Sequence, residues 1–217
     1  DGEIEDYLVS IPAYDWGDLP DGIYNTDTTG PDGPSHLITP GLGIGPDIDA
    51  ETNGIPSPNA DGDDNDGSPD DEDGVTLPTT ITPGQPVTFT VNLTNTSGET
   101  ATVYTFVDWN GDGDFDDANE IMTQTVSDGS TGGVFSLTTT VPLTASTNIS
   151  LGVRVRLSTD DTLGPDGPAP DGEIEDYLVS IPAYDWGDLP DGIYNTDTTG
   201  PDGPSHLITP GLGIGPD

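Results

Sequence analysis

The chain has 217 residues with no cysteine and no lysine, and its 41 acidic residues against two arginines give a formal net charge of −39. Such acidity excludes a nucleic-acid binder, because phosphate contacts need Lys and Arg, and the lack of cysteine excludes disulfide and thiolate chemistry. No apolar run approaches the ~18–20 residues of a membrane span, so we expect no membrane insertion in this segment.

The opening of the chain returns at its end. Residues 1–47 and 171–217 are identical, which sets a period of 170 residues. We therefore expect a window onto a longer tandem array. Residues 1–12 are then the last strand of a preceding repeat, 13–182 a complete repeat, and 183–217 the start of the next.

The junction between repeats contains no Gly/Ser linker and carries Pro12 and Pro20, which restrict the backbone. Repeats joined in this way are expected to hold a fixed relation, with neighbouring copies as partners.

Residues 13–74 are rich in Gly, Pro, Asp and Asn and predict an irregular acidic arm, which either packs along a sandwich or bridges to a neighbour. We expect its apolar anchors to bury against the preceding sandwich; they are Tyr14, Trp16, Leu19 and Tyr24. The alternative is a disordered acidic linker.

Within the arm, acids crowd into residues 61–73. Such a run repels itself unless a cation offsets the charge. The sequence predicts bound calcium here, with a solvated acidic loop as the alternative. The candidate ligands are Asp61, Asp63, Asn65, Asp66, Asp71 and Asp73.

Residues 75–182 predict an all-β fold. Apolar residues alternate with polar ones over 87–93, 135–141 and 149–157, while 101–109 is β-branched and aromatic throughout. Two further strands are expected at 74–77 and 174–181. Short strands at this spacing favour an antiparallel β-sandwich of the immunoglobulin-like type.

The segment DWNGDGDFDDANE at 108–120 carries the strongest chemical signal. Oxygen ligands at alternate residues followed by a glycine resemble a calcium loop, because the glycine permits the sharp turn that lets them converge. The flanks are strands instead of helices, and the closing acid comes one position late. The alternative is an ion-free turn. The candidate ligands are Asp108, Asn110, Asp112, Asp114, Asp116, Asp117 and Glu120.

Arg154 and Arg156 are the two cations of the chain, and their alternation with apolar residues turns them away from the predicted core. We expect them to pair with acids of the adjacent strand, with Glu173, Glu175 and Asp176 as the leading candidates; an exposed pair would contribute only ~0–1 kcal/mol. The alternative to such structural pairing is a ligand site.

The motifs YDWGDLPDGIY, FVDWNGDGDFDDANE, VRVRLS and GEIEDYLVSI occur in an order that resembles the GEVED domain, with Ile174 in place of Val in the name-giving motif. The resemblance spans the whole period. It implies a large secreted or surface protein of bacteria that binds calcium, and it brings no catalytic residues.

Two function classes remain. The first is a structural repeat, the shaft of an extracellular fibre or of a giant surface adhesin in a biofilm, rigidified by Ca2+. The alternative is an adhesive or carbohydrate-binding module that contacts other cells or matrix, for which Trp16, Trp109 and Trp186 offer few aromatic platforms. No constellation of side chains predicts an enzyme.

Overall fold

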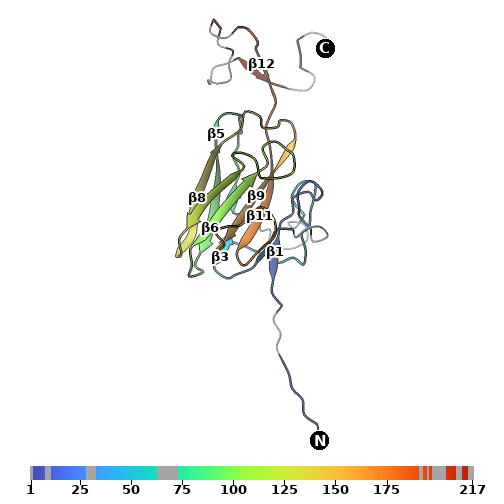
Figure 1. Ribbon diagram of the computed structural model, residues 1–217, viewed down its shortest axis with the longest axis vertical. Coiled ribbons are helices and arrows are strands. Elements are labelled where there is room, and N and C mark those ends of the chain that lie inside the picture. Colours follow the sequence, from blue (N-terminus) through green and yellow to red (C-terminus); the bar gives the residue numbers. More distant parts are fainter. Residues whose placement is uncertain are drawn as a thin grey trace.

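The computed structural model describes residues 2–7, 11–27, 33–62, 73–190, 193–194, 196, 204–208 and 212–214. This part of the chain is all-β and contains no helix, and so none that could span a membrane. Two facing sheets form a β-sandwich, the arm lies beside it, and β12 and the N-terminal residues lie beyond opposite ends of it (Figure 1).

The first sheet is antiparallel and has the order β11-β9-β6-β7. Its strands are β6 (Ala101–Val107), β7 (Ile121–Val126), β9 (Ser150–Ser158) and β11 (Glu173–Ser180). The predicted strands at 101–109, 149–157 and 174–181 are thereby confirmed, whereas β7 is an addition to the predicted set.

The second sheet is built around β5 (Pro86–Asn95), which pairs with β8 (Ser130–Thr140) along one side. On its other side β5 pairs with β3 (Leu42–Ile44) and β4 (Val75–Thr76). The arm was predicted to be irregular, yet it supplies β3 to the sandwich.

Alternation explains the core between the sheets. Every second residue of β5 is buried, from Val87 through Phe89 and Val91 to Leu93. These side chains pack against Val153 and the other inward residues of the facing sheet, with Trp109 at one end.

Unlike β5, strand β9 is buried on both faces, from Leu151 to Ser158. One face packs into the sandwich core. The other is covered by the arm, which forms a second apolar cluster there. That cluster comprises Leu19, Tyr24, Ala60, Tyr104, Phe106, Phe115, Leu163 and Ala169.

The arm has a small sheet of its own. Strand β1 (Tyr14–Trp16) pairs antiparallel with β2 (Ser35–Leu37), and β2 pairs parallel with β10 (Pro168–Ala169) from the segment between β9 and β11. In the second copy, β12 (Tyr184–Trp186) and β13 (Ser205–Leu207) pair in the equivalent register.

The identical segments nevertheless meet different surroundings. Leu19 is fully buried whereas its copy Leu189 is 55 % exposed, and Tyr24 is buried whereas Tyr194 is 52 % exposed. The expectation that Leu19 and Tyr24 bury against the preceding sandwich was wrong: both pack against residues of the sandwich that follows them.

Candidate functional site

Strand β11 carries the GEIED motif and contacts different elements from its two faces. Because successive side chains on a strand point to opposite faces, Glu173 and Glu175 share one face while Ile174 and Asp176 share the other. All four residues are buried. A buried carboxylate needs hydrogen-bond donors, and each face finds them in a segment far away in sequence.

The two glutamates hold the edge of the facing sheet. A carboxylate oxygen of Glu175 accepts the N–H of Gly74 at 2.9 Å, directly before β4, and Glu173 accepts the N–H of Ile44 in β3. These contacts fix both ends of the arm's second half to the sandwich.

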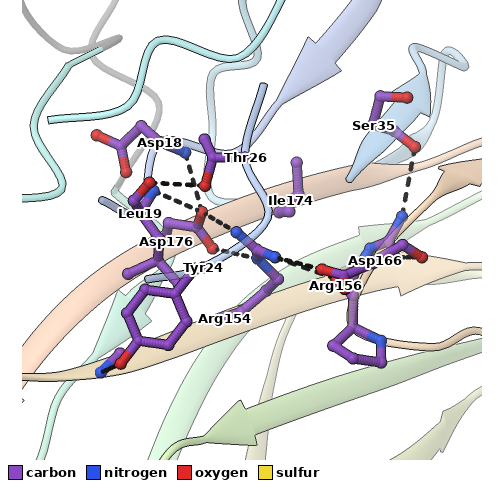
Figure 2. A network of polar contacts seen from close by, with 12 residues as sticks. Asp18, Leu19, Tyr24, Thr26, Ser35, Arg154, Arg156, Asp166, Ile174 and Asp176 are labelled. Atoms are coloured by element: carbon purple, nitrogen blue, oxygen red, sulfur yellow. Dashed lines mark hydrogen bonds and ion pairs between the residues drawn. The ribbon is translucent and has the colours of Figure 1, made fainter. Parts of the chain in front are cut away.

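Asp176 holds the beginning of the arm. Its Oδ2 accepts the backbone N–H groups of Asp18 at 2.9 Å and Leu19 at 3.0 Å (Figure 2). One position earlier on the same face, the N–H of Ile174 donates to the carboxylate of Asp15 at 2.7 Å. The arm and β11 therefore exchange backbone-to-carboxylate hydrogen bonds in both directions.

Arg154 completes the coordination of Asp176. Its Nε and Nη2 donate to Oδ1 and Oδ2 of Asp176, each at 2.8 Å, which is the bidentate geometry of a strong charge-assisted pair. A second carboxylate, Asp166, lies 3.2 Å from Nη1. Burial alone would lower the pKa of Arg154, but the nearby carboxylates, Asp176 first and then Asp166 and Asp18, together outweigh it and the pKa is raised.

Arg156 uses a different set of acceptors. Its Nε donates to Nε2 of His36 at 2.9 Å, and its Nη groups donate to backbone carbonyls. Those carbonyls belong to Gly164, Asp166, Gly167 and Ser35. Burial, and then the neighbouring Arg154, lowers the pKa of Arg156 to about 9, so it stays charged at neutral pH.

His36 is a neutral acceptor in this arrangement. Because Arg156 can only donate, Nε2 of His36 carries no proton, and Nδ1 donates to the carbonyl of Asp171 at 2.7 Å. Burial, and then the charge of Arg156, lowers the pKa of His36 well below its usual 6.5.

The arginine pairs are buried, so the small energy of an exposed pair does not apply to them. Arg154 and Arg156 do face away from the sandwich core, but the arm buries both completely. Asp176 pairs with Arg154 as predicted, whereas Glu173 and Glu175 face the opposite side and bind backbone amides of β3 and Gly74.

In the 108–120 loop, Asp108 is turned inward and fully buried. Its carboxylate accepts the N–H of Gly111 at 2.6 Å, the N–H of Gly113 at 3.0 Å and the hydroxyl of Tyr24 at 2.9 Å. Gly113 has a φ of 94°, the left-handed turn that the calcium-loop pattern requires at this position. Burial raises the pKa of Tyr24. The loop is thus tied to the arm through Asp108.

Glu120 closes the loop onto the backbone. Its two oxygens accept the N–H of Trp109 at 2.9 Å and the N–H of Asp117 at 3.1 Å. Burial raises the pKa of Glu120 to about 7, against the smaller lowering from these hydrogen bonds.

The loop's exposed rim brings three oxygen-bearing side chains together. The amide nitrogen of Asn110 lies 2.8 Å from Oδ2 of Asp112 and 2.6 Å from Oδ2 of Asp117. Asp114 accepts the N–H of Asp116, and nearby carboxylates, Asp114 first, raise the pKa of Asp116. No group of three or more acids or histidines poised around a metal ion occurs within the described ranges.

The second predicted calcium segment is described only at its borders. Asp63, Asn65, Asp66 and Asp71 lie outside the described residues. Asp61 accepts the hydroxyl of Ser57 at 2.6 Å, and Asp73 precedes the Gly74 amide bound by Glu175.

A family profile for the GEVED domain matches residues 102–180, from β6 to the end of β11. The chain contains a GEVED domain. The matched region of this GEVED domain includes both arginines, the 108–120 loop and the GEIED strand, while the arm lies outside it. Comparison with curated proteins gives no match, and comparison with solved structures gives none either.

Several contacts of the site were not predicted, namely those of Asp15, Asp18, His36 and Asp166 and the Tyr24–Asp108 pair. The sequence offered one weak signal for His36: a buried arginine needs acceptors, and each period contains a single histidine that can serve as a neutral one.

Proposed function

We propose that this protein is a structural tandem repeat, the shaft of an extracellular bacterial fibre or giant surface adhesin. The observation that carries the proposal is the burial of the arm's backbone contacts with β11. These contacts make the arm and the sandwich one unit. Each 170-residue period would then add one rigid unit to the array.

We assign the sandwich to the immunoglobulin-like type. The order β11-β9-β6-β7 corresponds to the G-F-C-C′ sheet of that fold, and β5 flanked by β8 and by β3 and β4 corresponds to its other sheet. In such sandwiches the chain enters at one end and leaves at the other, which suits domains joined in tandem.

Contacts at the junction support a fixed relation between repeats. Asn148, with a left-handed φ of 59°, donates its N–H to the carbonyl of Ile181 at 2.9 Å and accepts the N–H of Ala183 at 3.2 Å. Beyond Pro182, Tyr184 and Trp186 border a groove of about 610 Å³ that the sandwich end also lines.

The adhesive alternative has less support. Its aromatic platform would need several exposed tryptophans, whereas Trp109 is buried in the core and Trp186, which is 40 % exposed, lines the junction groove.

The proposal is tested with arrays of one to four periods studied by small-angle X-ray scattering. A rigid shaft predicts that the maximum dimension grows by a constant increment per period. Growth with roughly the square root of the number of periods, as for flexibly linked beads, would overturn it.

We further propose that Ca2+ rigidifies the 108–120 loop. The candidate ligand atoms there are all oxygens, as Ca2+ prefers. The hydrogen bonds of the Asn110 amide bring this side chain beside the carboxylates of Asp112 and Asp117. Asp108 and Glu120 bind backbone amides, so the exposed rim, including Asp116, would hold the ion. Bound calcium would neutralise the mutual repulsion of these acids.

Extracellular calcium modules bind at ~10⁻⁴–10⁻³ M, and at ~100 times its dissociation constant one site stabilises the fold by ~2.7 kcal/mol. Calcium is therefore expected to raise the melting temperature of the chain. In Asp112→Asn/Asp117→Asn, part of that increase should be lost. An unchanged melting temperature between chelated and calcium-loaded protein would remove calcium from the proposal and leave the shaft intact.

A further inference from the structure

The acidic residues are distributed unevenly over the sandwich. The chain carries 41 acids, yet the strands β5, β6, β7 and β8 contain no charged residue. Their solvent-facing positions are taken largely by Thr and Ser instead. Strands β7 and β8 therefore form a neutral side on a strongly anionic protein.

Strand β8 is also an edge strand. It pairs with β5 from Pro86↔Thr140 to Leu93↔Gly133, and no other strand of the described chain pairs with it. Alternate peptide groups of such a strand point away from its sheet and form a template for another strand. Val134, Ser136 and Thr138 are exposed along it, with Val134 at 69 %.

Natural edge strands are usually protected by charged residues, proline or short length. Strand β8 has eleven residues, no proline and no charge. It has one irregularity, the register shift opposite Leu93 and Asn95, and this leaves residues 134–140 in regular pairing.

The space beside β8 is open. A groove of about 530 Å³ lies between β8 and β7, the edge strand of the other sheet. Ile121, Thr123, Ser136 and Thr138 are among its lining residues, so it offers hydroxyl and aliphatic surface without a carboxylate.

We propose that β8 is a lateral docking strand for β8 of a second copy of this chain, joined antiparallel about a two-fold axis. The charge distribution favours a second copy as the occupant. Two chains of −39 each repel wherever their acidic loops meet, and the neutral β8 side lets their backbones approach. Strand β8 meets the requirement that a two-fold interface be self-complementary.

This pairing joins chains side by side, whereas the proposed shaft concerns contacts along one chain. Each can therefore fail without the other. A single strand pair gives weak association, but many repeats in register would multiply it, and a fibre would become a bundle.

The direction in which salt changes self-association distinguishes this pairing from one built on ion pairs. The residual force between copies is repulsion between like net charges, which salt screens within a Debye length of ~8 Å at physiological ionic strength. Self-association is therefore expected to strengthen with salt. An interface built on ion pairs would weaken.

The test is sedimentation equilibrium of the 217-residue chain in chelator, so that calcium cannot bridge acidic loops. We expect a weight-average mass that rises with protein concentration and rises further with salt. Ser136→Glu/Thr138→Glu should abolish the rise, because β8 strands paired about residue 137 would bring four carboxylates together.

Two controls make the result decisive. Thr96→Glu/Thr100→Glu adds the same charge in the exposed turn between β5 and β6 and should still associate. Mixing Ser136→Glu/Thr138→Glu with Ser136→Lys/Thr138→Lys should restore association. A wild-type chain that stays monomeric at every concentration and salt would overturn the proposal, as would equal association of the two glutamate variants.

Discussion

At the scale of single residues, Asp176 connects three parts of the protein. Its carboxylate receives two hydrogen bonds from Arg154 and two from the backbone of the arm. A buried ion pair by itself is weak evidence of stability, because desolvation offsets its Coulomb energy. The four directed donors, however, specify one position for residues 18 and 19.

Replacing Asp176 by Asn should leave Arg154 as a buried charge without its bidentate partner. Breaking a buried pair in this way costs ~3–5 kcal/mol, measured as the free energy of unfolding in urea. Asp166→Asn is the matched control, because the Asp166 side chain is 48 % exposed and its loss should cost ~1 kcal/mol or less. Equal losses for the two variants would contradict the role given to Asp176.

His36 makes stability depend on pH. The unfolded chain protonates this histidine below about pH 6.5, its ordinary pKa, whereas the folded chain holds it neutral beside Arg156. The unfolded state then binds more protons below pH 6.5. The free energy of unfolding therefore decreases as the pH is lowered below 6.5, and above pH 6.5 the His36 contribution is fully retained. The slope approaches ~1.4 kcal/mol per pH unit.

The measurement compares the pH dependence of the free energy of unfolding in wild type and in His36→Gln. Subtracting the two profiles cancels the contributions of other titrating groups, such as Glu120. The variant should lack the His36 contribution to the slope between pH 6.5 and 5. His206→Gln is the internal control, since this copy lies in an exposed strand and should keep the wild-type slope. A His36→Gln variant with the wild-type slope would refute the neutral-acceptor arrangement.

At the scale of elements, β11 works through both of its faces, and this explains what the sequence could predict. Alternating residues identified β5, β8 and β9 and the directions of Arg154 and Arg156. The arm was expected to pack along a sandwich or to bridge to a neighbour, but its burial of the two arginines was not predicted, because its contacts join residues more than 100 positions apart, such as His36 and Arg156. The local alternation of apolar and polar residues cannot predict contacts between segments so far apart in the sequence.

Short or weakly patterned strands were missed for other reasons. Strand β3 has three residues within a Gly/Pro-rich segment, and β7 places Gln124 between its buried residues Met122 and Val126. In the 108–120 loop, the turn at Gly113 was predictable, but the direction of Asp108 was not, because its partner Tyr24 comes from the arm.

Gly172 sets the start of β11. Its φ is +94°, and a Cβ there would lie 1.7 Å from the carbonyl oxygen of Leu157. Gly172→Ala should therefore destabilise the fold by at least ~1–3 kcal/mol through backbone strain, with the clash adding to it. Gly2→Ala alters the same motif in the first copy, where nothing lies within 4 Å, and should leave the melting temperature unchanged. Equal effects would mean that β11 does not need this glycine.

At the scale of the whole molecule, one sequence occurs in two environments. The hairpin register and the hydrogen bond from Thr26 to the carbonyl of Leu19 recur in the second copy as Thr196 to Leu189. Local structure is therefore set by the segment itself. Burial is set by the sandwich, which the first copy contacts through β9 and β11.

Amide hydrogen exchange on this chain tests the central claim, that arm and sandwich form one unit, most directly. The N–H groups of Asp18 and Leu19 bind Asp176, and their copies in Asp188 and Leu189 provide the comparison within the same molecule. We predict that Asp18 and Leu19 exchange as slowly as core amides of β5, through global unfolding, while Asp188 and Leu189 exchange orders of magnitude faster. Equally fast exchange in both copies would contradict the account, because the arm would then be free of the sandwich in solution.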